Sequence, residues 1–167
     1  MLMSIDQSLS CSGIVIWSKP VVFATIKTTN NISQIDRIRN IKASIAELVS
    51  EHGVTDIVIE SLPYGLNSTS VRPLAGLYYC INDLCLDLGI TFSEANITAV
   101  KKYATGSGRA KKKDMLLAFS KTAVYERAKE LGHKQTTGLA DIADAFYIGA
   151  YHKSKEDVNW SLDEYTK

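Results

Sequence analysis

Two acidic residues, Asp6 and Glu60, occupy positions in the sequence from which they could bind one metal ion together. Asp6 ends a short apolar segment, Leu2–Asp6, and Glu60 directly follows the β-branched run Ile57-Val58-Ile59. Consecutive apolar residues of this kind are typical of a strand that is buried on both faces in a parallel arrangement. If the two strands are parallel neighbours, about 4.8 Å apart, both carboxylates lie at one sheet edge, within reach of one hard cation.

Either acid alone is also explained as a residue that ends a strand and caps the next turn. Glu60, however, comes directly after three apolar residues, next to a core of low dielectric constant where an unpaired charge is costly. A cation bound between Asp6 and Glu60 would compensate both charges. The pair therefore predicts a metal site at this edge of the sheet.

A second acidic pair, Asp141 and Asp144, is three residues apart in a helix predicted from Thr137 to Tyr151. This spacing places both acids on one helix face. Acids near a helix N-terminus also complement the helix macrodipole, which is the plainer explanation. Small neighbours would let the helix approach the sheet closely: Ala140, Ala143 and Ala145. We therefore expect this helix to direct both carboxylates at the strand ends.

Four carboxylates with no histidine or cysteine in ligand spacing form an all-oxygen set. Such a set suits Mg²⁺, with Mn²⁺ as a substitute, rather than zinc. Two such ions about 4 Å apart activate a water and stabilise the leaving 3′ oxygen in phosphodiester hydrolysis. The candidate catalytic and metal-binding residues are Asp6, Glu60, Asp141 and Asp144.

Positive charge is concentrated in one part of the chain, although the net charge is only +1. Residues 97–134 hold 10 Lys or Arg against 3 Asp or Glu, and residues 99–113 carry six basic residues and no acid. A solvated helix face is the plainer interpretation. A surface that contacts DNA or RNA phosphates is the sharper one, because Lys and Arg there gain affinity by releasing counterions.

The composition fits one globular domain over residues 1–167, with a core at about 1–153 and a C-terminal tail at about 154–167. The three cysteines form no C-x-x-C pair, which argues against a disulfide framework and a zinc ribbon. A signal peptide and a membrane-spanning apolar run are both absent from the sequence pattern. We expect a soluble protein of the cytoplasm.

Hydrophobic periodicity predicts the elements that position these residues. Strands are expected at Leu2–Asp6, Gly13–Trp17, Val21–Lys27, Ile57–Glu60 and Ile90–Glu94, the first three antiparallel. Helices are expected from the N-cap Ser33 to Gly53, and at Val71–Leu88, Lys111–Leu131 and Thr137–Tyr151. The fold class is therefore α/β, a five-stranded mixed sheet flanked by helices. The helix Val71–Leu88 is apolar over more than one stripe, so a partner is expected to bury its surplus surface.

Four segments carry a wider resemblance. They are Ser4-Ile-Asp-Gln-Ser-Leu-Ser-Cys-Ser-Gly13, Ile57-Val-Ile-Glu-Ser61, Val100-Lys-Lys-Tyr-Ala-Thr-Gly-Ser-Gly-Arg-Ala-Lys-Lys113 and Leu139-Ala-Asp-Ile-Ala-Asp-Ala-Phe146. Each is unspecific alone, but together, in this order and spacing, they resemble the RuvC family of Holliday junction resolvases over nearly the whole chain.

The resemblance implies an RNase H-like fold and a homodimer that makes paired symmetric nicks across four-way DNA junctions with a divalent metal. It implies that the four acids match the family's catalytic carboxylates and that Lys101 and Lys112 match its two functional lysines. It also places a junction-wedging aromatic near Tyr64. The candidate DNA-binding residues are Lys101, Lys102, Arg109, Lys111, Lys112, Lys113 and Tyr64.

Dimers of the family pack through the helix after the second catalytic strand, here Val71–Leu88. The dimer interface is therefore expected at Leu74, Leu77, Tyr78 and Ile81. The extra lysines at 102, 111 and 113 depart from the bacterial pattern and indicate a divergent, phage-borne member that would act in the host cytoplasm.

Three other functions fit parts of the pattern. The segment Asp6-Gln-Ser-Leu-Ser is similar to the first phosphate-binding hairpin of sugar-kinase and actin-type ATPases, but those need two such domains. An RNase H-like nuclease with broader branched-DNA or RNA–DNA hybrid substrates is a second alternative. A DNA-binding module with vestigial acids is a third, which metal-dependent cleavage would exclude.

Overall fold

The structure is a computed structural model that describes residues 1–62, 71–134 and 138–165. Its centre is a five-stranded sheet in the order β3-β2-β1-β4-β5. The strands are β1 (Leu2–Asp6), β2 (Cys11–Ile16), β3 (Val22–Lys27), β4 (Asp56–Glu60) and β5 (Thr91–Ala95). β1, β2 and β3 are antiparallel neighbours, whereas β4 is parallel to both β1 and β5. The predicted mixed sheet, with strand one beside strand four, is confirmed.

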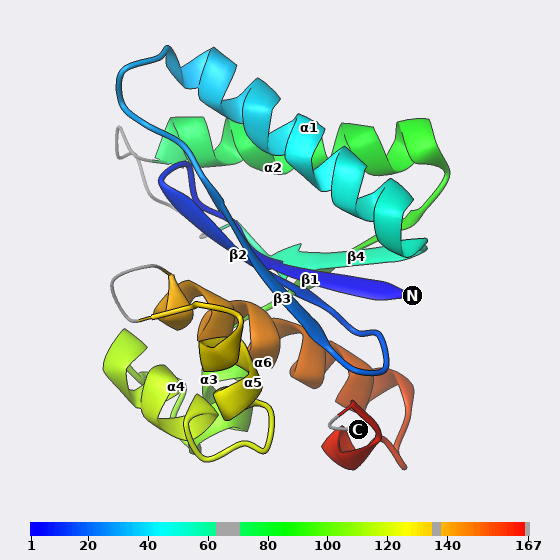
Figure 1. The fold of residues 1–167 in the computed structure, drawn as a ribbon, viewed down its shortest axis with the longest axis vertical. Coiled ribbons are helices and arrows are strands. Elements are labelled where there is room, and N and C mark those ends of the chain that lie inside the picture. The colour runs from blue at the N-terminus through cyan, green and yellow to red at the C-terminus, as the bar shows by residue number, and fades with distance from the viewer. Residues whose placement is uncertain (63–70, 135–137, 166–167) are drawn as a thin grey trace.

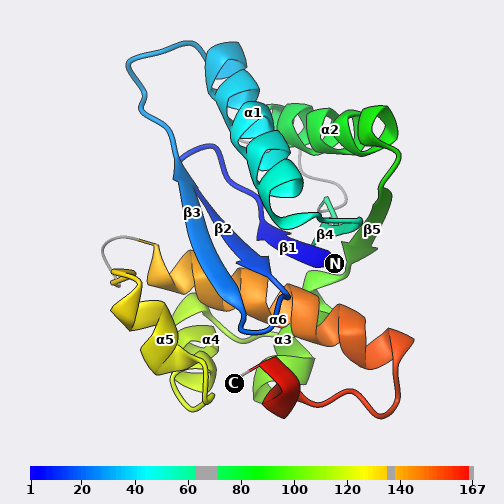
Figure 2. The ribbon, with the colours of Figure 1, turned by 45° about the vertical axis from the view of Figure 1, so that its right-hand side comes forward.

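Helices cover both faces of the sheet (Figure 1). α1 (Gln34–His52) and α2 (Val71–Leu88) lie on one face. The other face carries α3 (Ile97–Thr105), α4 (Lys112–Phe119), α5 (Tyr125–Glu130) and α6 (Leu139–Glu156), with α6 running beneath the strands (Figure 2). Alternation along β1 follows from this: Met3 and Ile5 enter the core under α1 and α2, and Leu2 enters the core around α6.

α1 begins and ends where its sequence dictates. The Ser33 side chain accepts a hydrogen bond from the Asp36 backbone N–H, and Gly53 closes the helix in the left-handed conformation, with φ 61°. Only glycine adopts that conformation without strain. The predicted start and end of this helix are confirmed.

α6 contacts β1 and β2 closely because two glycines make room for it. A Cβ on Gly13 of β2 would lie 2.1 Å from the backbone oxygen of Asp141. Farther along, a Cβ on Gly149 of α6 would lie 2.1 Å from Trp17 Nε1, which donates to Ser4 Oγ at 2.9 Å. The helix axis is therefore fixed against the sheet at two points.

The segment 97–134 departs from its prediction. Residues 97–105 form a helix, α3, which Asn96 caps, and the single helix expected at Lys111–Leu131 is two helices, α4 and α5. The break follows Phe119, where Thr122 Oγ1 donates to the Phe119 carbonyl at 2.7 Å. Hydroxyl side chains that bond backbone carbonyls compete with helix continuation. Phe119 and Val124 are both buried, so the turn keeps each in the core.

The expected dimer residues on α2 are mostly wrong. Leu77, Tyr78 and Ile81 are 0%, 7% and 0% exposed, because they face the protein's own core under α1, and only Leu74 is partly exposed. The large apolar side chains that α2 presents outward are instead Tyr79, Leu86 and Leu88, which are 65%, 77% and 46% exposed. One helix stripe packs on the sheet and another faces solvent, which the apolar pattern alone did not separate.

The C-terminal segment packs back onto the core. After α6 the chain turns into a 3₁₀ helix, Leu162–Tyr165. The rings of Trp160 and Tyr165 lie edge-on to Trp17, with centroids 6.0 and 5.4 Å away. Among the described residues, no helix is long and apolar enough to cross a membrane.

We predict that Gly13→Ala lowers the free energy of unfolding by at least about 2 kcal/mol, because its Cβ meets helix backbone that has no room to move. The melting temperature should fall by about 4–8 °C. Gly76→Ala on α2 is the control, since its Cβ would meet only the flexible end of Ile38 at 3.3 Å. Thermal denaturation checks both, and equal stability of Gly13→Ala and wild type would contradict the packing described for α6.

Candidate active site

Asp6 and Glu60 lie at the carboxyl ends of two adjacent parallel strands. Asp6 ends β1, Glu60 ends β4, and Ile5 lies beside Ile59 in the parallel register. Asp6 is also directly opposite Gly13 in the antiparallel pair, so it shares the sheet face that α6 covers. Both acids are partly buried at one edge of the sheet.

α6 carries the second pair of acids to the same edge. Because Gly13 lies against the backbone of Asp141, the first turns of α6 are held over the strand ends. The side chains of Asp141 and Asp144 are 19% and 15% exposed. The structure thus brings all four predicted acids together, two from strands and two from the helix.

Lys112, at the start of α4, reaches into this acidic group. Its Nζ donates to Asp141 Oδ1 and lies 3.9 Å from Asp144 Oδ2. Burial disfavours the charged ammonium, but the hydrogen bond to Asp141 and the charge of Asp6 outweigh burial and raise the pKa of Lys112 above its usual value. Lys112 therefore carries a positive charge among the carboxylates.

Burial and mutual repulsion disfavour the charged carboxylates. Burial first, and then the charge of Asp144, raise the pKa of Asp6 well above its ordinary value, with Lys112 opposing. Burial raises the pKa of Asp144 to about 6, with Lys112 opposing and Glu60 adding to it. Burial also raises the pKa of Glu60, and Lys101 lowers it. Three acids thus hold their protons more tightly than in water.

The donor set fits a hard divalent cation. Asp144 Oδ1 is buried and has no hydrogen-bond partner in the described part of the chain, and a buried carboxylate oxygen without a partner is costly. All four side chains offer only oxygen, which Mg²⁺ and Mn²⁺ prefer. Within residues 1–62, 71–134 and 138–165, no three acidic, histidine or cysteine side chains already converge as ligands. Lys112 instead takes up contacts with Asp141 and Asp144.

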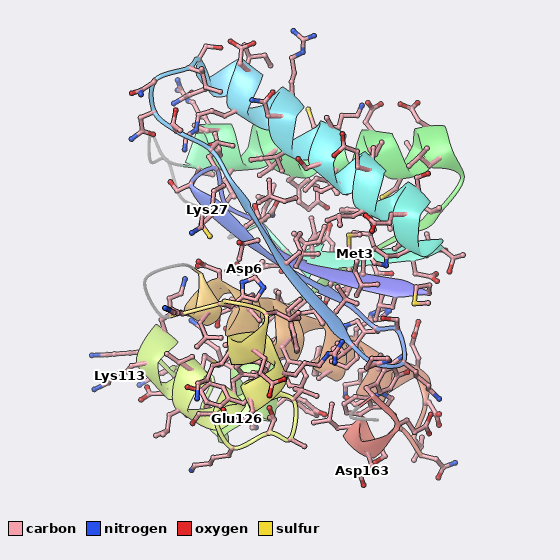
Figure 3. All side chains as sticks on the ribbon, viewed as in Figure 1. Met3, Asp6, Lys27, Lys113, Glu126 and Asp163 are labelled. Carbon is pink, nitrogen blue, oxygen red and sulfur yellow. The ribbon has the colours of Figure 1, made fainter. Side chains whose placement is uncertain are left out.

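The predicted basic residues fall into two groups. Lys101 and Lys112 act electrostatically on the acids. The others are exposed on α3, α4 and the loop between them: Lys102, Arg109, Lys111 and Lys113. Figure 3 shows Lys113 projecting from α4 on the side of the molecule where Asp6 lies. Tyr64 lies outside the described residues.

Three neighbours of the acids were not predicted. Cys11 of β2 donates a hydrogen bond to Asp141, and burial, with this bond, raises the thiol's pKa to about 11. Lys27 of β3 contributes positive charge beside Cys11. Gln7 Nε2 donates to the Glu60 carbonyl at 3.3 Å. The position of Cys11 could have been predicted, because residues two apart in a strand share a face and Gly13 is opposite Asp6. No pattern in the sequence predicts the bond from Gln7 to the neighbouring strand.

Comparison with known proteins gives consistent matches. The family described as crossover junction endodeoxyribonuclease RuvC matches residues 13–152, which contain Glu60, Asp141 and Asp144. A crossover junction endodeoxyribonuclease RuvC of Erythrobacter litoralis (strain HTCC2594) is 28% identical over 156 residues, 88% of this chain and 88% of the relative.

Solved structures agree in fold. T. thermophilus RuvC in complex with Holliday junction substrate superposes with a TM-score of 0.70 at 14% identity, over 95% of each chain. Fowlpox virus resolvase in complex with substrate Holliday junction DNA gives 0.60 at 19% identity, over 93% of this chain and 97% of that one.

The sheet order, the helix α6 across it and the acidic edge beside two lysines define an RNase H-like nuclease fold. The chain belongs to the RuvC family, the Holliday junction resolving endonucleases. The predicted resemblance to this family is thereby confirmed.

We predict that Asp144→Asn stabilises the metal-free protein at pH 7.5 by on the order of 2 kcal/mol. Because the folded pKa is about 6 against an ordinary 3.8, the folded state binds more protons between these values, so stability falls as pH rises through this window. The gain from Asn should therefore vanish near pH 4. Urea denaturation in EDTA at both pH values measures it.

Asp83→Asn is the control, an exposed acid that pairs with Lys42 on the surface. Its effect should stay within about 1 kcal/mol at both pH values. An Asp144→Asn protein that is no more stable than wild type at pH 7.5 would contradict the destabilising burial of this charge.

Proposed function

We propose that this chain is a Mg²⁺-dependent endodeoxyribonuclease that nicks four-way DNA junctions, with Asp6, Glu60, Asp141 and Asp144 as the metal-binding catalytic residues. The observation that supports this most is the gathering of four acids at one sheet edge, among them Asp144, whose buried Oδ1 has no hydrogen-bond partner within the described residues. The two relatives solved with Holliday junction DNA have the same fold. Mn²⁺ is expected to substitute for Mg²⁺.

The chain's own residues bind, orient and hold charge. Metal bound here would supply an activated water and stabilise the leaving 3′ oxygen. Lys112, whose raised pKa keeps it an ammonium, is positioned to attract the scissile phosphate rather than to accept a proton. Lys101 supplies a second positive charge beside Glu60. Lys102, Arg109, Lys111 and Lys113 extend the basic surface along α3 and α4, where DNA arms would lie.

A homodimer is part of the proposal. A four-way junction has approximate two-fold symmetry. Paired nicks therefore need two active sites that are related by a two-fold axis, as in a symmetric dimer. Tyr79 and Leu86 project from α2 as exposed apolar side chains seven residues apart, on one helix face. A second copy of the chain would bury this face.

We predict that Asp6→Asn and Glu60→Gln each reduce cleavage of a synthetic four-way junction in Mg²⁺ by at least about a thousandfold. Junction binding should remain within about threefold of wild type, because removing negative charge does not weaken attraction to phosphate. Cleavage is followed on gels and binding by fluorescence anisotropy, with duplex and RNA–DNA hybrid as substrate controls.

Glu126→Gln is the matched control, an exposed acid on α5 that pairs with Lys129. It should cleave like wild type. Retained cleavage in either Asp6→Asn or Glu60→Gln would refute the metal-site assignment, and preferential cleavage of the hybrid would refute the proposed substrate.

We predict that Leu86→Glu or Tyr79→Glu halves the mass measured by light scattering, because a buried unpaired charge opposes association. Neither substitution should lower the melting temperature by disturbing the core, since both side chains are exposed on the monomer. Leu117→Glu on α4, at a residue 58% exposed, is the control. A dimer of unchanged affinity in both α2 variants would place the interface elsewhere.

A further inference from the structure

A pocket with a mixed polar and apolar lining lies beside the acidic edge, on the α1 and α2 side of the sheet. Its volume is about 340 Å³. The loop 7–10 after β1, Gln34 and Arg37 of α1, and Pro73 and Leu74 of α2 line it. The basic surface of α3 and α4 lies on the opposite side of the sheet (Figures 1 and 2). None of the candidate acids or basic residues lines this pocket; of the predicted site residues that the structure describes, only Leu74, expected at the dimer interface, does so.

Gln7 joins the pocket to the active site. It follows Asp6 in the chain, and its Nε2 donates to the Glu60 carbonyl. The residue is 7% exposed, and its Oε1 is buried with no hydrogen-bond partner among the described residues. A buried acceptor without a donor is costly. Gln7 therefore holds an unused hydrogen-bond acceptor in the wall of the pocket, one residue from Asp6.

Arg37 supplies the pocket with a buried positive charge. It is 9% exposed. Its Nε donates to Thr28 Oγ1 at 2.7 Å and its Nη2 to Ser10 Oγ at 3.5 Å. A guanidinium has five N–H donors, and none of those of Arg37 forms an ion pair with a carboxylate in the described part of the chain.

A buried cation held only by neutral hydroxyls is expensive unless an anion compensates it. Guanidinium binds a phosphate through paired N–H donors. A phosphate, however, supplies no donor for Gln7 Oε1, whereas the amino and ring N–H groups of DNA bases do. One nucleotide, with its phosphate and its base, satisfies both groups. The apolar side chains of Leu9, Pro73 and Leu74 provide surface for the face of a base.

We propose that this pocket, the Arg37 pocket, binds one nucleotide of the cut DNA strand next to the scissile phosphate. Arg37 binds its phosphodiester, and Gln7 Oε1 accepts a hydrogen bond from its unpaired base. The inference rests on the proposed junction substrate, because bases at the branch point are free to unstack. The strand then runs from the lysines on one side of the sheet, past the acids, to the Arg37 pocket on the other.

We predict that Arg37→Gln weakens junction binding in EDTA about tenfold. The slope of log affinity against log salt should decrease in magnitude by about 0.7–0.9, the value of one phosphate contact. Arg39→Gln, an exposed arginine on the same helix, is the control and should change affinity less than threefold. Thermal melting confirms that each variant is folded.

A purely structural role for Arg37, tying α1 to the loop 7–10, predicts a different result with modified DNA. Binding is measured to a series of junctions, each with one neutral methylphosphonate near the cut. At one position the methylphosphonate should weaken binding by the wild-type protein but cause no further loss of binding by Arg37→Gln. An abasic site at the adjoining nucleotide should likewise weaken wild type but not Gln7→Leu.

Arg37→Gln protein that keeps the wild-type sensitivity at every methylphosphonate position would overturn the proposal. Because binding is measured in EDTA, cleavage does not enter the result. Wild-type protein that fails to cut junctions in Mg²⁺ would contradict the proposed function. Wild-type protein that cuts junctions, together with an Arg37→Gln variant that keeps its methylphosphonate sensitivity, would contradict only the proposal for the Arg37 pocket.

Discussion

The direct contact between α6 and the β1–β2 hairpin is the constraint on which the rest of the structure depends. Gly13 lets the helix backbone at Asp141 lie against β2, and Gly149 lets its far end lie over Trp17 and Ser4. Ordinary side chains at either glycine would separate the helix from the sheet. With both contacts made, two acids from α6 are fixed over two acids from the strands.

This geometry concentrates negative charge where solvent access is limited. Burial and repulsion raise the pKa values of Asp6, Glu60 and Asp144, and Lys112 and Lys101 compensate only in part. The four acids at this edge therefore lower the stability of the metal-free protein, as residues of functional sites commonly do. The same edge lies between the basic α3–α4 surface and the Arg37 pocket, the two regions between which we propose that a DNA strand crosses the acids.

Much of the fold was predictable because the relevant signals are local. Period-two and β-branched segments gave the strands, and the cap residues Ser33 and Gly53 gave the ends of α1. The segment 97–134 was less predictable. The basic residues of α3 hide the periodicity of this helix. The break between α4 and α5 after Phe119 depends on which side chains pack in the core. The dimer residues on α2 failed for a related reason: Leu77 and Tyr79 are equally apolar, and only packing decides which one faces inward.

By itself, the sequence determined the identity of the four acids, the two lysines beside them and the strands that carry Asp6 and Glu60. These follow from residue type, spacing and a resemblance that extends over nearly the whole chain. Only the tertiary structure shows that Lys112 contacts Asp141, that the Gln7 side chain bonds the Glu60 carbonyl, and that Arg37 is buried with no carboxylate partner among the described residues. Those relations join residues far apart in the chain, and they exist only once β1 has paired with β4 and the helices α1, α4 and α6 have packed on the sheet.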